Sequence, residues 1–301
     1  MVGCGGRGRP GIQPPGGLFV FCASYLPESG AECPRETSAS LRAPFAMTTE
    51  IIPVPCLTDN YAYLVGATDS KDVVVVDACE AEPIEQALRE RGLTLRAILS
   101  THHHHDHVGG NASLSERYGV PVFGHASEVQ RIPCLSHPLS DGDRFEIAGL
   151  AFHALHVPAH TRGALAYVSA GACFTGDTLF TGGAGRLFEG TPEELHRALY
   201  QVLGALSPST MLFTGHEYTL KNLTFALQVD KKNSALRQRH QEVAQKRERG
   251  EFTASASLEL ERATNPFLRV DRPEIALGLG LDAESAPVWV IQKLREARNL
   301  F

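Results

Sequence analysis

The stretch that decides the fold is Thr101-His102-His103-His104-His105-Asp106-His107, which directly follows an apolar run. Side chains two residues apart in an extended segment point the same way, so His102 and His104 can bind one metal ion from one face. After a turn, Asp106 and His107 can reach a second ion alongside. Imidazole nitrogens and carboxylate oxygens are suitable ligands for zinc or a similar divalent metal. The stretch therefore predicts a metal site at the end of a strand.

Two histidines of this stretch, His103 and His105, alternate out of phase with the predicted ligands. We expect them to support the site structurally rather than to bind metal. A cloned tag would also give a histidine run, but a tag is terminal and homopolymeric. This run is internal and continues into Asp106-His107-Val108-Gly109-Gly110, which argues against a tag.

A site for two metal ions needs more ligands than this loop supplies. Strand-end loops are where rigid scaffolds usually place chemistry. Taken singly, each further candidate carries little weight, because a lone histidine is more often a satisfied core or surface residue. Three candidates lie in polar breaks where predicted strands end: His160 in Pro158-Ala159-His160-Thr161, Asp177 in Phe174-Thr175-Gly176-Asp177-Thr178, and His216 in Thr214-Gly215-His216-Glu217.

Taken in this order, the segments resemble the metallo-β-lactamase superfamily, whose pattern is H-x-H-x-D-H followed by His, Asp and His. The resemblance implies two divalent metal ions per chain. We expect zinc, although iron and manganese accept the same ligands. Asp106 and Asp177 would be the catalytic carboxylates, with Asp177 bridging both ions. The implied ligands are His102, His104 and His160 for one ion, and Asp106, His107 and His216 for the other.

Two cations about 3.5–4 Å apart provide a known hydrolytic chemistry. A water shared between them loses a proton near neutral pH and becomes a hydroxide nucleophile. The cations also polarise the carbonyl under attack and stabilise the oxyanion that develops. The sequence offers no convincing serine or cysteine nucleophile. We therefore expect a metal-dependent hydrolase.

Further segments resemble glyoxalase II, the hydroxyacylglutathione hydrolase family within this superfamily. The similarity runs in order from about Met47 to Phe301. It implies a thioesterase that hydrolyses S-D-lactoylglutathione to D-lactate and glutathione, which completes methylglyoxal detoxification. The segments that carry the resemblance are residues 57–64, 176–180 with 185–191, 215–219 and 265–269.

The same resemblance implies that cations on the C-terminal helix bind the carboxylates of glutathione. Arg295 and Arg298 are three residues apart and therefore share one helical face, and arginine offers a forked donor to a carboxylate. From spacing alone they would be ordinary solvated charges. Arg186, Phe188 and Tyr218 fall at the family's remaining substrate-contact positions.

The chain departs from the family at three places. Gly163-Ala164-Leu165 stands where some members have Gly-His-Ile, Ala184 replaces a frequent cysteine, and Phe188 replaces a tyrosine of some relatives. No departure removes an implied metal ligand. We expect hydrolysis to survive while substrate affinity or metal preference shifts.

The expected fold class is α+β, with a four-layer αββα metallo-β-lactamase sandwich followed by a small α-helical C-terminal domain. Short β-branched runs alternate with helical stretches up to His216, and helices alone follow. A helix at residues 83–91 should end at Gly92, and the capping box at Thr191 should open a helix that reaches about Leu206.

The domain limits follow from these patterns. Gly, Pro, Arg and Ser dominate before Met47, where the pattern changes and where translation could instead begin. We expect residues 1–46 to form a disordered leader, residues 47–216 the catalytic domain, and residues 217–301 an α-helical substrate-binding domain. The helices expected in that last domain are 234–249, 257–263 and 287–298.

Composition excludes several classes of protein. Hydrophobic residues make up 43% of the chain and charged residues 21%, which is ordinary for a globular protein. No apolar run is long enough to span a membrane, and the net charge of -6 argues against a nucleic-acid partner. The seven cysteines include no C-x-x-C pair, which fits a reducing compartment. We expect a cytoplasmic monomer whose partner is a small-molecule glutathione thioester.

Two alternatives stay open. Persulfide dioxygenases share the fold and the H-x-H-x-D-H segment but use one iron for oxygen chemistry, and they generally lack a helical extension with a terminal basic pair. A non-catalytic metal-binding module would predict a broken ligand set, whereas all seven positions are filled here.

Overall fold

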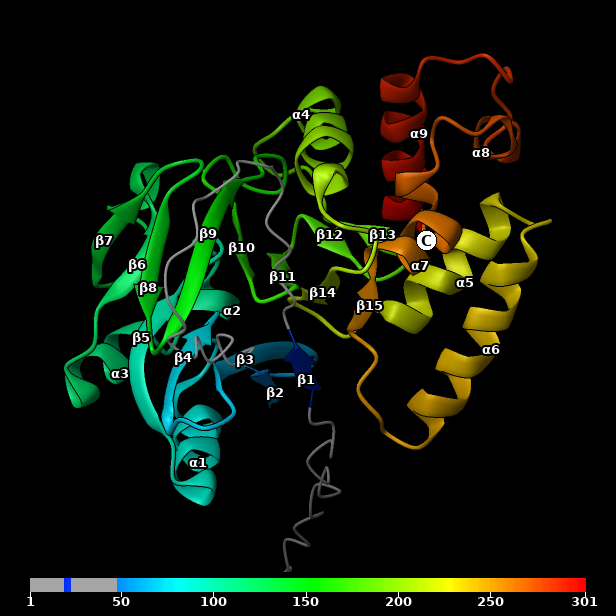
Figure 1. Ribbon diagram of the computed structural model, residues 1–301. Coiled ribbons are helices and arrows are strands. Elements are labelled where there is room, and N and C mark those ends of the chain that lie inside the picture. Colours follow the sequence, from blue (N-terminus) through cyan, green and yellow to red (C-terminus); the bar gives the residue numbers. More distant parts are fainter. Residues whose placement is uncertain (1–18, 23–47) are drawn as a thin grey trace, which may run out of the picture.

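The computed structural model describes residues 19–22 and 48–301. Two β-sheets lie at the centre, and helices cover their outer faces (Figure 1). The first sheet contains, in spatial order, β1 (Phe19–Cys22), β2 (Thr48–Cys56), β3 (Asn60–Ala67), β4 (Asp72–Val76), β5 (Thr94–Leu99), β6 (Val122–His125) and β7 (Leu135–Leu139). The second contains β15 (Ser255–Ser257), β14 (Met211–Thr214), β11 (Ala172–Gly176), β10 (Leu165–Ser169), β9 (Leu150–His156) and β8 (Arg144–Ile147). A small hairpin pairs β12 (Leu179–Phe180) with β13 (Gly183–Ala184).

The two sheets pack face to face because side chains alternate along their strands. In β4, Val74 and Val76 point into the core between the sheets, where Tyr167 and Phe174 of the second sheet meet them. Val73, one residue earlier, points to the opposite face. Both faces of β4 are therefore buried, which explains its continuous run of valines.

The outer face of the first sheet is covered by α1 (Ala81–Arg91) and α3 (Asn111–Tyr118). Ile84 and Leu88 of α1 lie four residues apart and are both buried against this sheet. The helix ends where Gly92 adopts the left-handed conformation, with φ of 62°. Glycine adopts this conformation without a steric penalty, so the predicted stop is confirmed.

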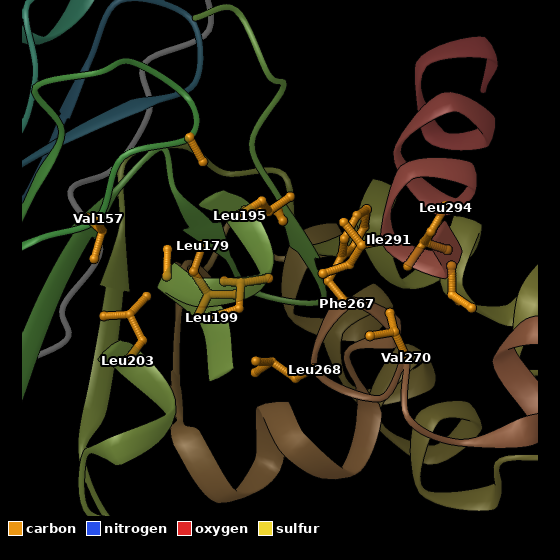
Figure 2. Packing of buried hydrophobic residues seen from close by; sticks show 14 of the residues in the cluster. Val157, Leu179, Leu195, Leu199, Leu203, Phe267, Leu268, Val270, Ile291 and Leu294 are labelled. Carbon is orange, nitrogen blue, oxygen red and sulfur yellow. The ribbon is translucent and has the colours of Figure 1, made fainter. Parts of the chain in front are cut away.

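The outer face of the second sheet is covered by α4 (Pro192–Arg197) and the turns that continue it. Figure 2 shows Leu195 and Leu199 from this segment near Leu179, with Ile291 and Leu294 of the last helix beyond them. The capping box at Thr191 is present. The helix predicted to reach Leu206 instead changes to a π-helical segment and then a 3-10 turn.

The order of layers is thus helices, first sheet, second sheet, helices, and the predicted αββα sandwich is confirmed. Among the described helices, none combines the length and apolarity needed to cross a bilayer. The helices that follow β14 gather at one side of the second sheet (Figure 1). They are α5 (Thr219–Val229), α6 (Ser234–Glu248), α7 (Leu258–Thr264), α8 (Pro273–Gly278) and α9 (Pro287–Leu300).

Strand β15 and the buried acid Glu261 connect the helical region to the sandwich. Strand β15 pairs antiparallel with β14, with Leu212 opposite Ala256. The carboxylate of Glu261 accepts a hydrogen bond from the backbone N–H of Gly182 at 2.9 Å and pairs with Arg239. The C-terminal helices are therefore fixed against the β12–β13 hairpin.

The N-terminal stretch was expected to be a disordered leader. Residues 19–22 differ from that expectation, because they form β1 and pair antiparallel with residues 48–51 at the edge of the first sheet. An unpaired edge strand readily accepts a further strand, which gives the physical reason for the pairing. The rest of residues 1–46 lies outside the described residues, so the prediction of a disordered leader stays a prediction there.

Candidate active site

The histidine stretch begins after the end of β5, and its first residue is hydrogen-bonded to the residue that follows β4. Asp77 directly follows β4, and its carboxylate accepts hydrogen bonds from Thr101 N at 2.7 Å and from Thr101 Oγ1 at 2.8 Å. The carbonyl of Thr101 accepts in turn from Leu165 N of the second sheet at 2.8 Å. The stretch is thereby held where the two sheets meet. It then enters the single-turn helix α2 (His105–Val108).

Three histidines converge into a first group. His104 Nδ1 lies 3.1 Å from His102 Nε2 and 3.0 Å from His160 Nε2. The sequence separates His160 from His104 by 56 residues. All three nitrogens therefore face one small volume, which is the arrangement expected of three ligands of one cation.

A second group lies beside the first. His107 Nε2 lies 3.3 Å from His216 Nε2, and Asp106 Oδ2 lies 3.3 Å from His216 Nε2 and 3.6 Å from His107 Nε2. These three residues can also hold a cation together.

Asp177 lies between the two groups. Its Oδ1 is 3.4 Å from His107 Nε2, and its Oδ2 is 3.5 Å from His160 Nε2 and 3.3 Å from His216 Nε2. Oδ1 is buried and has no hydrogen-bond partner among the described residues. An unpartnered buried carboxylate oxygen is costly, so this atom fits a position beside a cation.

In three of the histidines, the ring nitrogen that faces away from the site is bound by an acceptor. This bond decides which nitrogen of each ring can offer a lone pair to a cation. Nδ1 of His107 donates to Asp77 Oδ2 at 2.9 Å, Nδ1 of His216 to Asp59 Oδ1 at 2.8 Å, and Nδ1 of His160 to the Arg186 carbonyl at 2.9 Å. Each Nε2 is left with its lone pair facing the site, as in metal centres whose histidines are oriented by an outer acceptor.

The carboxylates make the second group attractive to positive charge. Burial lowers the pKa of the His107 imidazole, but Asp177 and Asp77 outweigh it and raise this pKa to about 10. In the first group, burial and the neighbouring His160 lower the pKa of His104 to about 4. Imidazole binds metal in its neutral form, so a cation in the second group would displace the proton that the raised pKa of His107 retains. The donor set therefore fits two divalent cations.

The two out-of-phase histidines differ in position. His103 points away from both groups, and its Nδ1 lies 3.1 Å from Glu128 Oε2. His105 is exposed and lines the mouth of the site. Neither belongs to the two groups described above, and their supporting role stays a prediction.

A cavity of about 660 Å³ opens above the two groups. It brings together every substrate-contact residue predicted from the sequence: Arg186, Phe188, Tyr218, Arg295 and Arg298. Sequence reasoning did not assign functions to five other lining residues, Asp59, Phe180, Ala184, Lys221 and Asn222. Asn222 follows Tyr218 by one helical turn, and this spacing could have pointed to it.

Two aromatic rings flank the ligands. The ring of Phe188 meets those of His104 and His160 edge to face, with centroids 5.4 Å and 5.2 Å apart. Phe188 remains 61% exposed. Tyr218 stacks on His216 with centroids 4.6 Å apart. Both rings restrict how a substrate can approach the two groups.

Comparison with protein families matches most of the residues that the structure describes. The sequence model described as "Metallo-beta-lactamase superfamily" matches residues 57–133 and 138–216, and the one described as "Hydroxyacylglutathione hydrolase C-terminus" matches residues 217–301. A hydroxyacylglutathione hydrolase from Synechococcus sp. (strain JA-2-3B'a(2-13)) is 46% identical over 254 residues, which cover 83% of this chain and 99% of that protein. Its namesake from Ruegeria pomeroyi is 43% identical over 257 residues, covering 85% and 100%.

Solved structures agree on the fold. ETHE1 from Myxococcus xanthus aligns with a TM-score of 0.59 at 23% identity, over 81% of this chain and 89% of that one. TTHA1623, solved in a di-iron-bound form, aligns with a TM-score of 0.50 at 28% identity, over 72% and 99%. With the family models and the sequence relatives taken together, this chain belongs to the hydroxyacylglutathione hydrolase family of the metallo-β-lactamase superfamily.

Proposed function

We propose that this protein hydrolyses S-(2-hydroxyacyl)glutathione, with S-D-lactoylglutathione as the substrate and D-lactate and glutathione as products. One observation carries the proposal. A single cavity joins the two ligand groups at one end to Arg186, Arg295 and Arg298 at the other. A glutathione thioester has its scissile bond on the central cysteine and carboxylates at the peptide termini, so it needs a hydrolytic region and a cationic region within one cavity.

The arginine end is prepared for an anion. Arg295 is 5% exposed, and it donates to the Ala184 carbonyl and to Asn299 Oδ1. Burial, followed by repulsion from Arg298 and Arg186, lowers the pKa of the Arg295 guanidinium to about 9. Buried cations that repel one another are costly unless an anion joins them. A carboxylate of glutathione would supply that negative charge.

The ligand end supplies the hydrolytic chemistry. We assign His102, His104 and His160 to one cation and Asp106, His107 and His216 to the other, with Asp177 shared. When bound, two such cations provide a hydroxide nucleophile at neutral pH and polarise the thioester carbonyl.

The chain's own groups hold this end in place. The carboxylates of Asp77 and Asp59 fix the His107 and His216 rings, and Phe188 and Tyr218 shield the centre from the side.

We propose two zinc ions per chain, with iron or manganese as the alternatives. The two adjacent ligand groups support the number, and the di-iron form of TTHA1623 is consistent with it. Metal analysis of the purified protein, together with a panel of glutathione thioesters, tests both the metal and the acyl preference. Close to two metal ions per chain and release of thiol from S-D-lactoylglutathione are expected. A fully metallated protein that leaves this thioester intact would refute the activity.

The persulfide dioxygenase alternative predicts oxygen consumption with a glutathione persulfide. Measuring oxygen uptake beside thioester hydrolysis on the same sample separates the two activities. The arginines carried by α9 favour the thioesterase, because that helix belongs to the segment matched as the hydroxyacylglutathione hydrolase C-terminus. A cytoplasmic location and a monomeric state remain predictions from the sequence, to be tested by fractionation and by light scattering.

A further inference from the structure

Asn222, in the first turns of α5, lies against the guanidinium of Arg298. Its Oδ1 accepts from Arg298 Nε at 3.2 Å and from Arg298 Nη2 at 3.0 Å. Asn222 is 3% exposed and lines the cavity. One neutral oxygen therefore binds two of the donors of this arginine and leaves its others for a ligand.

The orientation of the Asn222 amide is fixed by its other partners. Nδ2 donates to the carbonyl of Thr181 at 3.1 Å, so the oxygen must face Arg298. The β12–β13 hairpin also packs against the amide, since a Cβ at Gly183 would lie 2.7 Å from Asn222 Cγ. The amide can neither flip nor move toward the hairpin.

The other cavity arginine of α9, Arg295, has the same kind of partner, whereas two arginines outside the cavity do not. Arg295 is bound by a backbone carbonyl and a side-chain amide, both neutral. Outside the cavity, Arg239 pairs with Glu261, and Arg269 Nε lies 3.1 Å from Asp230 Oδ2. Arg239 and Arg269 are thus held by carboxylates, whereas Arg295 and Arg298 are held by neutral acceptors.

We infer that Asn222 is a positioning residue that aims Arg298 at a carboxylate of the bound glutathione without neutralising its charge. This inference rests on the proposed function. A carboxylate at position 222 would form a bidentate ion pair with Arg298 and would compete with the ligand. The amide is thus a specificity determinant for substrates that carry an anionic group at this end of the cavity.

Asn222→Asp tests the inference, because it keeps the shape of the side chain and changes its charge. We expect KM for S-D-lactoylglutathione to rise about ten- to hundredfold, in line with the loss of a hydrogen bond to a charged group. kcat should change far less than KM. In Asn222→Ala, Arg298 keeps its free charge but loses the hydrogen bonds that orient it. The KM of this variant should therefore rise less than that of Asn222→Asp. A purely structural role predicts instead that both variants lose activity on every thioester alike, with or without carboxylates.

A second substrate makes the readout specific. S-Lactoyl-N-acetylcysteamine carries the same acyl group without the carboxylates. Asn222→Asp should lower kcat/KM for S-D-lactoylglutathione at least about tenfold more than for this neutral thioester. Gln201→Glu adds the same charge at an exposed position that is not among the cavity-lining residues, and it should leave KM unchanged. Equal losses on both substrates would overturn the inference.

Binding of S-methylglutathione, measured by calorimetry on the metallated proteins, separates this inference from the proposed function. Wild type should bind, and Asn222→Asp should bind about tenfold more weakly or worse. If both bind equally, the role of Asn222 is wrong while the proposed function stands. If wild type does not bind, both are wrong.

Discussion

The two ends of the cavity are built on opposite electrostatic rules. At the ligand end, imidazole and carboxylate atoms from four segments of the chain converge, and acids behind the histidines fix the rings. At the arginine end, cations from α9 and the loop after β13 share a space in which only neutral acceptors bind Arg295 and Arg298, as far as the described residues extend. The first end is arranged to gather positive charge, and the second to attract negative charge. Changes at the first should therefore act on kcat, and changes at the second on KM.

The largest effect is expected from Asp177→Ala. This change removes the carboxylate that lies between both ligand groups, so turnover should be abolished and the metal content should fall. Thioester hydrolysis and metal analysis on the same sample check this. Asp282→Ala, on an exposed acid outside the cavity, serves as the control. Full activity of Asp177→Ala would refute its bridging role.

Asp77→Asn should cost about 10–100-fold in metal affinity or in kcat, which is usual when an outer acceptor of a metal-binding histidine is lost. The Asp77 carboxylate accepts from Thr101 N, Thr101 Oγ1 and His107 Nδ1. In Asp77→Asn, one carboxylate oxygen is replaced by an NH2 group. At least one of the three N–H or O–H groups would then face this NH2 group instead of an acceptor. Chelator competition measures the metal affinity. An unchanged affinity and kcat would contradict the role of Asp77 in orienting His107.

Arg298→Gln should raise KM for S-D-lactoylglutathione about tenfold and alter kcat little, because the guanidinium binds a remote part of the substrate. The same change at Arg295 should act in the same direction. Steady-state kinetics separate KM from kcat. A fall in kcat with no change in KM would mean that the arginine end does not bind substrate as proposed.

The smallest effect is expected from Phe188→Tyr, which restores the hydroxyl found in some relatives. One added hydrogen bond to a neutral group contributes about 0.5–1.5 kcal/mol, so KM should fall about two- to tenfold. Phe188 is 61% exposed at the mouth of the cavity, and the added hydroxyl needs no repacking of the core. Phe188→Leu, which restores no donor, is the control. A rise in KM would show that the ring itself, rather than a missing donor, limits binding.

The sequence predicted elements whose causes are local. The helix that ends at Gly92 and the capping box at Thr191 depend on residues a few positions apart. Strands β3, β4 and β9 likewise follow from short apolar runs. Strand β15 was not predicted, because Ser255-Ala256-Ser257 has no pattern of its own and is a strand only through its pairing with β14.

Strand β2 was also missed, since Pro53 and Pro55 argue against a strand. Residues 19–22 pair only with residues 48–51. Pro53 and Pro55 therefore lie beyond this pairing, where no backbone N–H is needed for a hydrogen bond to β1. Proline is tolerated at such an edge. The pairing partner, rather than the local residue preference, decided the conformation here.

By itself, the sequence predicted which imidazole and carboxylate side chains gather at the ligand end, and the structure brings them together. Their places at strand ends can be read from neighbouring residues. Only the tertiary structure decided which groups orient these side chains. Asp77 binds Thr101, 24 positions away, and His107, 30 positions away. Asn222 binds Arg298, 76 positions away. Such contacts arise when sheets and helices pack, because orientation and burial set the role of a polar side chain and neither is encoded in its immediate neighbours.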